Sequence, residues 1–159
     1  MTLKKPEPIV ESIMSKQLIT IDADSSAFQA AKKMSEKVVS SIIIKDSGKI
    51  VGILTERDFI KQVCAADLQA SKTPVTSIMS SPLIVIDKGL GLEKATETMI
   101  KNKVRHLAVS DSNNQIIGII SSRDLIRLFI DKLESIGNTT PQLLKGLYWE
   151  EEPMEGLGF

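Results

Sequence analysis

The sequence has few of the residues on which most catalytic and metal centres depend. Its 159 residues include one cysteine, Cys64, and one histidine, His106. One cysteine excludes an intramolecular disulfide and a cysteine-rich metal site, and one histidine excludes a histidine cluster. The sequence also lacks a Gly-x-x-x-x-Gly-Lys-Ser/Thr phosphate loop and a Gly-x-Ser-x-Gly nucleophile elbow. Because so few nucleophile–base pairs are available, we expect a protein with no enzymatic activity and no metal.

An excess of one charge and a long apolar run are also missing. Lys plus Arg and Asp plus Glu number 20 each, so the formal net charge is zero. Without a basic field, nucleic acid is not an expected partner. No apolar run approaches the ~20 residues of a membrane span, and no apolar signal core follows residues 1–6. We therefore expect a cytoplasmic protein that binds neither nucleic acid nor a membrane.

What the sequence does contain is an internal repeat. The hexapeptide Val-Glu-Ser-Ile-Met-Ser at Val10 is matched by Val-Thr-Ser-Ile-Met-Ser at Val75, 65 residues later. After one extra residue in the second copy the offset is 66, and the stretch 52–58 corresponds to 118–124. Composition alone does not produce such agreement. The repeat predicts a lead-in at 1–9, a first repeat at 10–70, a linker at 71–74, a second repeat at 75–136 and a tail at 137–159.

Each repeat predicts the same elements in the order β-α-β-β-α. Strands are indicated by β-branched runs, helices by apolar residues three and four apart, and turns by Asp, Ser and Gly. The first repeat gives strands at 18–22, 41–44 and 49–54, a hairpin turn at 46–48, a helix with Phe28, Ala31, Met34 and Val38 on one face, and a helix from 56 to about 69. The second gives strands at 83–87, 106–109 and 116–121 and helices at about 90–101 and 122–136, with Gly137 as C-cap.

This order of elements predicts an α/β (α+β) fold. Each repeat would form a small sheet with both helices on one face, and the two repeats would pack with pseudo-two-fold symmetry. The last helix is more apolar than packing on its own sheet requires. Its surface is either buried between the repeats or forms part of a homodimer interface, and both can hold. The apolar residues are Leu125, Ile126, Leu128, Phe129, Ile130 and Leu133.

The tail departs from the repeat. A turn is expected at 138–141 and one helical turn at 142–146, before Tyr148 and Trp149, the single tyrosine and tryptophan of the chain. Three glutamates, 150–152, follow them. One interpretation is that the tail lays its aromatics onto the repeats or onto a dimer mate. The other is an acidic docking peptide for another protein.

The stretch from Thr55 to Asp58, and its counterpart from Ser121 to Asp124, lies where a strand runs into a helix. A hydroxyl followed three residues later by an acid is the pattern of a capping box, which needs no ligand. The strict box prefers Glu or Gln, because Asp is short for reaching back to the cap N–H. Both copies here have Asp.

The same turns also suit a ligand. If Asp58 and Asp124 point outward, each carboxylate could accept hydrogen bonds from both hydroxyls of a ribose. Thr55 and Ser121 would then bind ribose or phosphate beside the helix N-terminal amides. Glycines three residues before these hydroxyls, at 52 and 118, would allow backbone or ligand to approach closely.

The doubled pattern resembles a tandem pair of cystathionine-β-synthase (CBS) domains. The resemblance covers about residues 10–134 and rests on Met14-Ser15, Met79-Ser80 and the two Gly-x-x-Thr/Ser-x-x-Asp turns. It implies a Bateman module, in which two CBS repeats pack sheet to sheet and form adenosyl-ligand sites in the clefts between them. It further implies AMP, ADP, ATP or S-adenosylmethionine as a ligand, no obligatory cofactor, and pairing of modules into homodimers.

The resemblance also implies roles for individual residues. Asp58 and Asp124 would bind ribose, with Thr55 and Ser121 near ribose or phosphate. The segment 103–107 resembles one from which family members reach a nucleotide phosphate, here with Arg105 and His106, although His106 could equally be a structural group. The first copy, at 38–42, lacks these cations, so the two clefts should differ. The residues expected to wall the adenine are Thr20, Ile42, Val85 and Leu107.

Together these features favour a non-catalytic regulatory or sensor module. An adenosyl ligand would shift its conformation, and an unidentified effector protein would receive the signal through association. The alternative is a ligand-free structural or scaffolding homodimer in which the two aspartates only cap helices.

Overall fold

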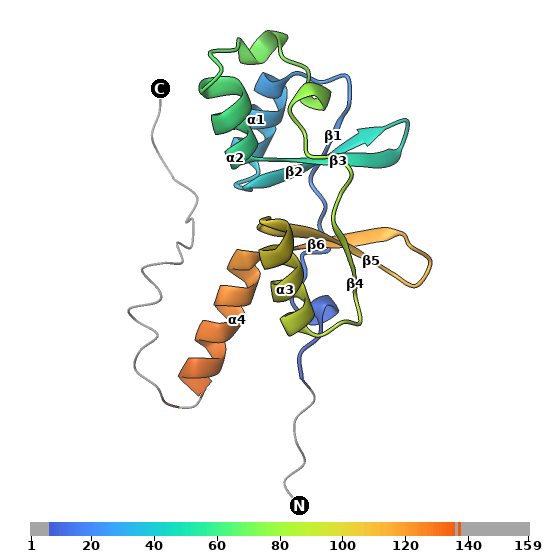
Figure 1. Cartoon of the computed structure of the whole chain (residues 1–159), viewed down its shortest axis with the longest axis vertical. Helices are drawn as coiled ribbons and strands as arrows, with labels where there is room; N and C mark the ends of the chain where they lie inside the picture. The colour runs from blue at the N-terminus through green and yellow to red at the C-terminus, as the bar shows by residue number, and fades with distance from the viewer. Residues whose placement is uncertain (1–6, 136, 138–159) are drawn as a thin grey trace, which may run out of the picture. The chain divides into compact units, whose positions relative to one another are not determined.

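The computed structural model describes residues 7–135 and 137 of the chain. These residues form four α-helices and two three-stranded sheets, as Figure 1 shows. They separate into two compact units. The first unit comprises residues 17–83, and the second combines residues 7–16 with the described residues from Ile84 onward. The two repeats in the predicted order β-α-β-β-α are thereby confirmed.

The first unit has its three strands in the order β1-β2-β3. Strand β1 pairs parallel with β2, and β2 pairs antiparallel with β3. The predicted turn between β2 and β3 uses Ser47 and Gly48 at φ 49° and 80°, the left-handed conformation that a tight hairpin needs. Both helices lie on one face of the sheet (Figure 1). The elements are β1 (Thr20–Asp22), α1 (Ala27–Glu36), β2 (Ser41–Asp46), β3 (Lys49–Thr55) and α2 (Glu56–Phe59).

The second unit repeats this topology. Its strands have the order β4-β5-β6, with a parallel β4–β5 pair and an antiparallel β5–β6 pair. Its two helices again lie on one face of the sheet (Figure 1). The elements are β4 (Val85–Asp87), α3 (Leu92–Asn102), β5 (His106–Ser110), β6 (Ile116–Ser121) and α4 (Ser122–Ser135).

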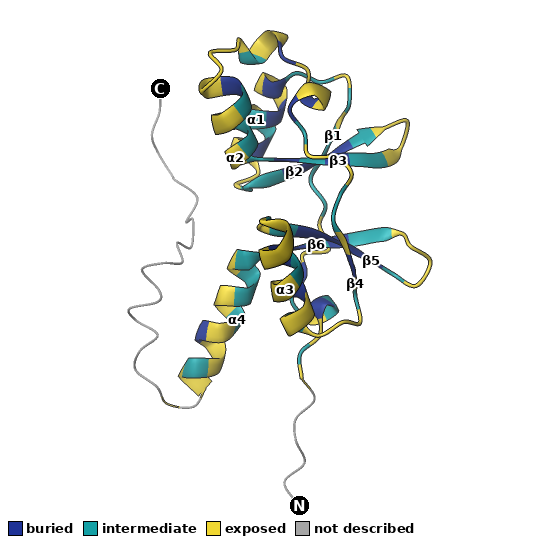
Figure 2. Ribbon diagram, viewed as in Figure 1, coloured by how far each residue is buried: buried dark blue, intermediate teal, exposed yellow. Residues whose placement is uncertain are grey.

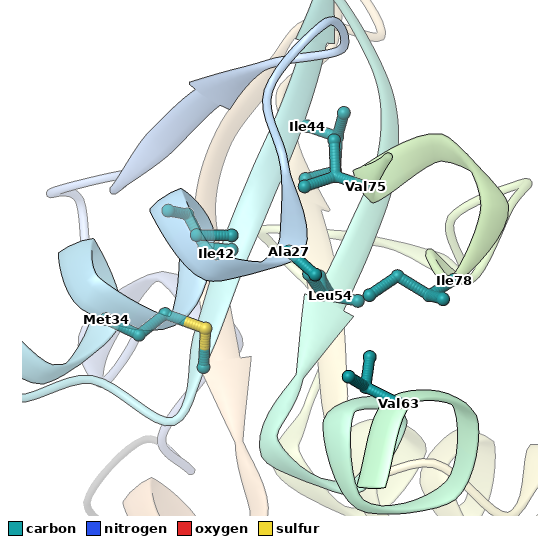
Figure 3. Packing of buried hydrophobic residues seen from close by; sticks show 9 residues of the cluster. Ala27, Met34, Ile42, Ile44, Leu54, Val63, Val75 and Ile78 are labelled. Atoms are coloured by element: carbon teal, nitrogen blue, oxygen red, sulfur yellow. The ribbon is translucent and has the colours of Figure 1, made fainter. Parts of the chain in front are cut away.

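Each unit has its own apolar core between its sheet and its helices. Figure 2 shows the buried residues within each unit, and Figure 3 shows how α1, β2 and β3 contribute to the first core. Adjacent turns supply the rest of that core. The first core contains Ala27, Ala30, Met34, Ile42, Ile44, Leu54, Val63, Val75 and Ile78. The second contains Val10, Met14, Ile86, Ala95, Met99, Leu107, Val109 and Ile120.

The buried face of α1 differs from the predicted one. Ala27, Ala30 and Met34 face the core, whereas Phe28 is 55% exposed. Val38 is 48% exposed and lies beyond the end of α1. A capping box between Ser26 and Gln29 begins the helix at Ala27. The helix packs on the core through two small alanines and Met34, and the larger Phe28 stays outside that contact.

The second helix of the first repeat is shorter than predicted. Regular α-helix ends at Phe59 and is followed by a π-helical segment, Ile60–Cys64, rather than continuing to about residue 69. In this segment the Ala65 N–H donates to the Ile60 carbonyl at 2.9 Å. An apolar pattern at spacings of three and four does not distinguish such a wider turn from an α-helix.

The opening segment of each repeat pairs with the third strand of the other repeat. Ser15 exchanges two backbone hydrogen bonds with Ile119 of β6, at 2.9 and 3.0 Å. Ser80 does the same with Ile53 of β3, at 2.8 and 3.0 Å. The compact units and the sequence repeats therefore divide the chain at different places.

Helix α4 is only partly covered within the described chain. Ile130 is 5% exposed and Leu125 packs against the second core, but Ile126 and Phe129 are 42% and 57% exposed. Gly137 has φ 73°, and its N–H donates to the Glu134 carbonyl at 3.0 Å, as expected of a C-cap. The predicted turns at 138–146 and the Tyr148-Trp149 segment lie outside the described residues. No helix in the described part is long and apolar enough to span a bilayer.

Candidate functional site

The turn between β6 and α4 is fixed by a carboxylate. The backbone N–H and the Oγ of Ser121 both donate to Asp124 Oδ2, each at 2.7 Å. In return the Asp124 N–H donates to Ser121 Oγ at 3.3 Å. Three hydrogen bonds within four residues hold both side chains in one geometry at the helix N-terminus.

The turn between β3 and α2 is built in the same way. The Thr55 N–H donates to Asp58 Oδ2 at 2.8 Å, and Thr55 Oγ1 donates to the same oxygen at 2.7 Å. The expectation that aspartate is too short for this role is wrong, because one oxygen lies within reach of both the amide and the hydroxyl. The capping interpretation is thus confirmed for both copies, whereas ribose binding stays a prediction.

Capping uses only one oxygen of each carboxylate. Among residues 7–135 and 137, the Oδ1 atoms of Asp58 and Asp124 have no hydrogen-bond or ion-pair partner. Both side chains are half-buried. Each turn therefore holds a carboxylate oxygen that is positioned by the cap and remains available to accept a hydrogen bond.

The first amide of each helix is already used. The Ser122 N–H donates to the Arg105 carbonyl at 2.9 Å, and the Glu56 N–H donates to the Ser40 carbonyl at 3.2 Å. Arg105 and Ser40 occupy matching positions just before β5 and β2. The third amides, of Asp58 and Asp124, bind the capping hydroxyls, so an anion at either helix N-terminus would meet the second amide and the nearby side chains.

Arg105 and His106, which were singled out from the sequence, lie beside the turn between β6 and α4; in chain order this is the second turn, and the turn between β3 and α2 is the first. His106 is the register partner of Ser121 across β5 and β6, and the Arg105 side chain is exposed. In the first unit the partner of Thr55 is Ser41. The second turn is therefore flanked by Arg105 and His106 where the first turn is flanked by Ser40 and Ser41.

The four side chains expected to wall an adenine fall on two different faces. Ile42 and Leu107 are 0% exposed and belong to the cores beneath the helices. Thr20 pairs with Ile43, and Val85 pairs with Ala108. Because neighbouring residues of a strand point to opposite faces, Thr20 and Val85 lie on the face away from those cores. That face is also the one that presents Thr55 and Ser121.

Gly52 and Gly118 make room for methionines of the opening segments. A Cβ at Gly52 would clash with Met79 Sδ, and a Cβ at Gly118 would lie 2.7 Å from Met14 Sδ and 2.8 Å from the Ser15 carbonyl oxygen. The close approach expected at these glycines is therefore made by the chain itself. The Met-Ser pairs and the glycines were both identified from the sequence, but the contact between them was not predicted. Both motifs occur once in each repeat, and this could have suggested the contact.

Other chemistry is not evident in the described residues. They contain no group of three or more His, Cys, Asp and Glu side chains arranged to hold a metal. Cys64 is exposed at the end of the π-helical segment.

Comparison with known proteins agrees with the repeat and with the fold. Two stretches, residues 10–64 and 75–131, match the family model described as CBS domain. A 17.7 kDa protein of Acidianus ambivalens is 31% identical over 123 residues, which cover 77% of this chain and 73% of that protein. The CBS domain-containing protein CBSCBSPB1 of Arabidopsis thaliana is 29% identical over 116 residues, which cover 72% of this chain but 21% of the plant protein.

A solved structure adds information on ligands. The CBS domain pair of protein MJ0100, in complex with 5′-methylthioadenosine and S-adenosyl-L-methionine, superposes with a TM-score of 0.71. It is 30% identical in sequence, and the alignment covers 80% of this chain and 99% of that one.

Proposed function

This chain belongs to the CBS-domain family and carries two such domains in tandem, and from this premise we propose that it is a regulatory module that binds an adenosyl compound. The ligand class would be AMP, ADP, ATP or S-adenosylmethionine. Binding would shift the conformation and so change the surface that an effector protein recognises. The CBS pair is a regulatory module, and the relatives described above bear no enzymatic name, so we propose no catalytic activity.

One observation carries this proposal. The Thr55–Asp58 and Ser121–Asp124 pairs each fix a carboxylate with one oxygen engaged and the other available among the described residues. A ribose presents two adjacent hydroxyls, which are donors that such a carboxylate can accept. Because the cap holds the acceptor in place beforehand, little side-chain entropy is lost when the ligand binds. The adenosyl ligands in the MJ0100 complex support the choice of ligand class.

The neighbours of the second turn suggest which ligand it would prefer. Arg105 is always charged, and His106 lies opposite Ser121 in the sheet. Phosphate groups would therefore be favoured beside Ser121 and Asp124, and the first turn would favour a ligand with little negative charge. Thr20 and Val85 would contact the base, because they share the sheet face of the two turns. Ile42 and Leu107 would support that face from within the cores.

Isothermal titration with AMP, ADP, ATP and S-adenosylmethionine tests the proposal on the full chain. At least one ligand should release or absorb heat, and Asp124→Ala should weaken a ligand at the second turn by about tenfold or more, because hydrogen bonds to a charged acceptor contribute about 1.5–3 kcal/mol each. Asp58→Ala tests the first turn in the same way.

A matched control separates binding from capping. Gln29→Ala breaks the capping box of α1, where the Ser26 N–H donates to Gln29 Oε1 at 2.8 Å. It should cost about 0.5–2 kcal/mol of stability, as an aspartate-to-alanine change at a cap would, but leave affinity unchanged. If the aspartate variants behaved like Gln29→Ala, the carboxylates would be caps alone.

The capping bonds also favour a second candidate, a structural or scaffolding homodimer without a ligand. Both aspartates have a complete role within the described structure, and α4 carries exposed apolar residues that a second copy could cover. The same titration discriminates between the two functions. No heat and no thermal shift with any of the four ligands would support the scaffold.

A further inference from the structure

Helix α4 carries an exposed ridge that the function above does not use. Arg123, Ile126, Phe129 and Lys132 are all exposed and follow one another at intervals of three residues. Side chains at this spacing are neighbours on a helix surface. Ile126 and Phe129 lie in the middle of the ridge, and a cation lies at each end. We call these four residues the α4 ridge.

Exposed apolar residues between two cations define the chemistry of a matching partner. It must offer apolar side chains, preferably aromatic, next to carboxylates. Neither Arg123 nor Lys132 forms an ion pair with any described residue. Among residues 7–135 and 137, therefore, the two cations have no ion-pair partner and the apolar residues between them are covered only in part.

The chain itself contains a segment of this kind just beyond α4. Residues 143–149 include three leucines and end in Tyr148-Trp149, and Glu150, Glu151 and Glu152 follow directly. The formal charges of this segment and of the rest of the chain are also opposite in sign. Residues 1–137 hold 19 of the 20 basic and 16 of the 20 acidic residues, a formal charge of +3, whereas residues 138–159 hold one lysine and four glutamates, −3.

The geometry at the end of α4 allows this segment to reach the ridge. At Gly137 the backbone is left-handed, φ 73°, which ends the helix and lets the chain turn back. From Gly137 back to the centre of the ridge is about 10 residues of helix, or about 15 Å. The 11 residues from Gly137 to Tyr148 span up to about 36 Å when extended, so they cover this distance with room for a turn.

We propose that the chain's own C-terminal segment docks on the α4 ridge, with Tyr148 and Trp149 on Ile126 and Phe129 and the glutamates at Arg123. A chain that turns back at Gly137 runs from the C-terminal end of α4 toward its N-terminal end. It therefore meets Phe129 before Ile126 and Arg123, which is the order in which the aromatics and the glutamates occur. The occupant of the α4 ridge is thus a segment of the same chain and not a second protein.

Trp149 is the single tryptophan, so its fluorescence reports on docking without a label. The experiment measures its emission maximum and its quenching by acrylamide in the full chain without added ligand. In the parent protein we expect a blue-shifted, protected tryptophan. Phe129→Ser should lower the ratio of docked to undocked segment by about tenfold, shifting the emission to the red and increasing quenching.

Phe28→Ser is the matched control. Phe28 is 55% exposed and Phe129 is 57% exposed, so the same apolar group is removed from an equally exposed site on the other unit. This variant should leave Trp149 emission unchanged, and circular dichroism confirms that both variants fold. A water-exposed Trp149 in the parent, or equal shifts in the two variants, would overturn the proposal. Protection of Trp149 that disappears on dilution would also overturn it, since a second copy would then be the occupant.

Discussion

At the scale of single residues, Gly52 and Gly118 are positions where packing leaves no room for a side chain. Both lie in third strands, next to the methionine of an opening segment. Neither needs an unusual backbone angle, because positive φ among the glycines occurs at Gly48 and Gly137. Space for a neighbouring side chain, rather than conformational freedom, explains these two residues.

Gly118→Ala is therefore expected to destabilise the protein by about 1–3 kcal/mol, the usual cost of overpacking. The added Cβ would lie 2.7 Å from Met14 Sδ and 2.8 Å from the Ser15 carbonyl oxygen, and backbone yields less easily than a methionine. Denaturant unfolding measures the change. Gly91→Ala is the comparison without a steric conflict, since a Cβ there meets nothing within 4 Å, and it should cost less even though Gly91 is the N-cap of α3. Equal stability of the Gly118 variant and the parent would contradict this explanation.

At the scale of elements, both repeats end their first helix with a left-handed residue that is not glycine. Val38 follows α1 at φ 52°, and Lys103 follows α3 at φ 54°. The next N–H reaches back across the helix end, from Val39 to the Met34 carbonyl and from Val104 to the Met99 carbonyl, each at 3.0 Å. At Val38 this hydrogen bond stabilises a left-handed backbone conformation that is ordinarily unfavourable for a β-branched residue.

Val38→Gly should raise the free energy of unfolding by roughly 1 kcal/mol, because glycine adopts this angle without the steric penalty. Little burial is lost, since Val38 is 48% exposed. Val85→Gly provides the comparison. Val85 is 46% exposed but lies in β4, where glycine should destabilise. Thermal or denaturant melts of the two variants should thus move in opposite directions, and destabilisation by both would argue against strain at Val38.

The elements also show what a sequence pattern can and cannot predict. The strand at Ile116–Ser121 and the start of α4 at Ser122 match the prediction, because β-branched runs and capping residues are local signals. The predicted buried face of α1 is wrong at Phe28, because apolar character alone favoured Phe28 whereas the helix packs on the core through the smaller Ala27 and Ala30. The wider turn at Ile60–Cys64 likewise had no signal in apolar spacing.

At the scale of the whole molecule, the internal repeat predicted the fold but not the path of the chain. Met14 and Ser15 look like the start of the first repeat, yet they pair with β6 of the second, and Ser80 pairs with β3 of the first. Each compact unit therefore contains a segment from the other repeat. Alignment of the two repeats shows which residues correspond in sequence, but not which strand an opening segment pairs with. The pairing of each opening segment with the other repeat could therefore not be predicted from the alignment. For the site, the capping carboxylates were predictable, but the burial of Ile42 and Leu107 depended on which face the helices cover.

The negative charge of the docked segment is expected to affect the proposed ligand site, because the two share neighbouring residues at the start of α4. Arg123 belongs to the α4 ridge and directly precedes Asp124. If Glu150–Glu152 lie at Arg123, they repel the phosphates of a nucleotide held by Asp124. Replacing all three glutamates with glutamine should therefore increase the affinity for ATP by about two- to tenfold, since each exposed charge pair contributes at most about 1 kcal/mol. The affinity for 5′-methylthioadenosine, which has no phosphate, should not change.

Parallel titrations of ATP and 5′-methylthioadenosine into the parent and the triple variant measure this difference. Glu93→Gln with Glu97→Gln is the control, because it removes negative charge from exposed positions on α3 of the same unit that are not part of the docked segment, although it also breaks the Lys94–Glu97 ion pair. Equal gains in affinity for both ligands would mean that the segment blocks the site by its bulk rather than by its charge. A gain for ATP in the control as well would point to the net charge of the unit. Selective gain in the triple variant alone requires that the glutamates act where the phosphates bind.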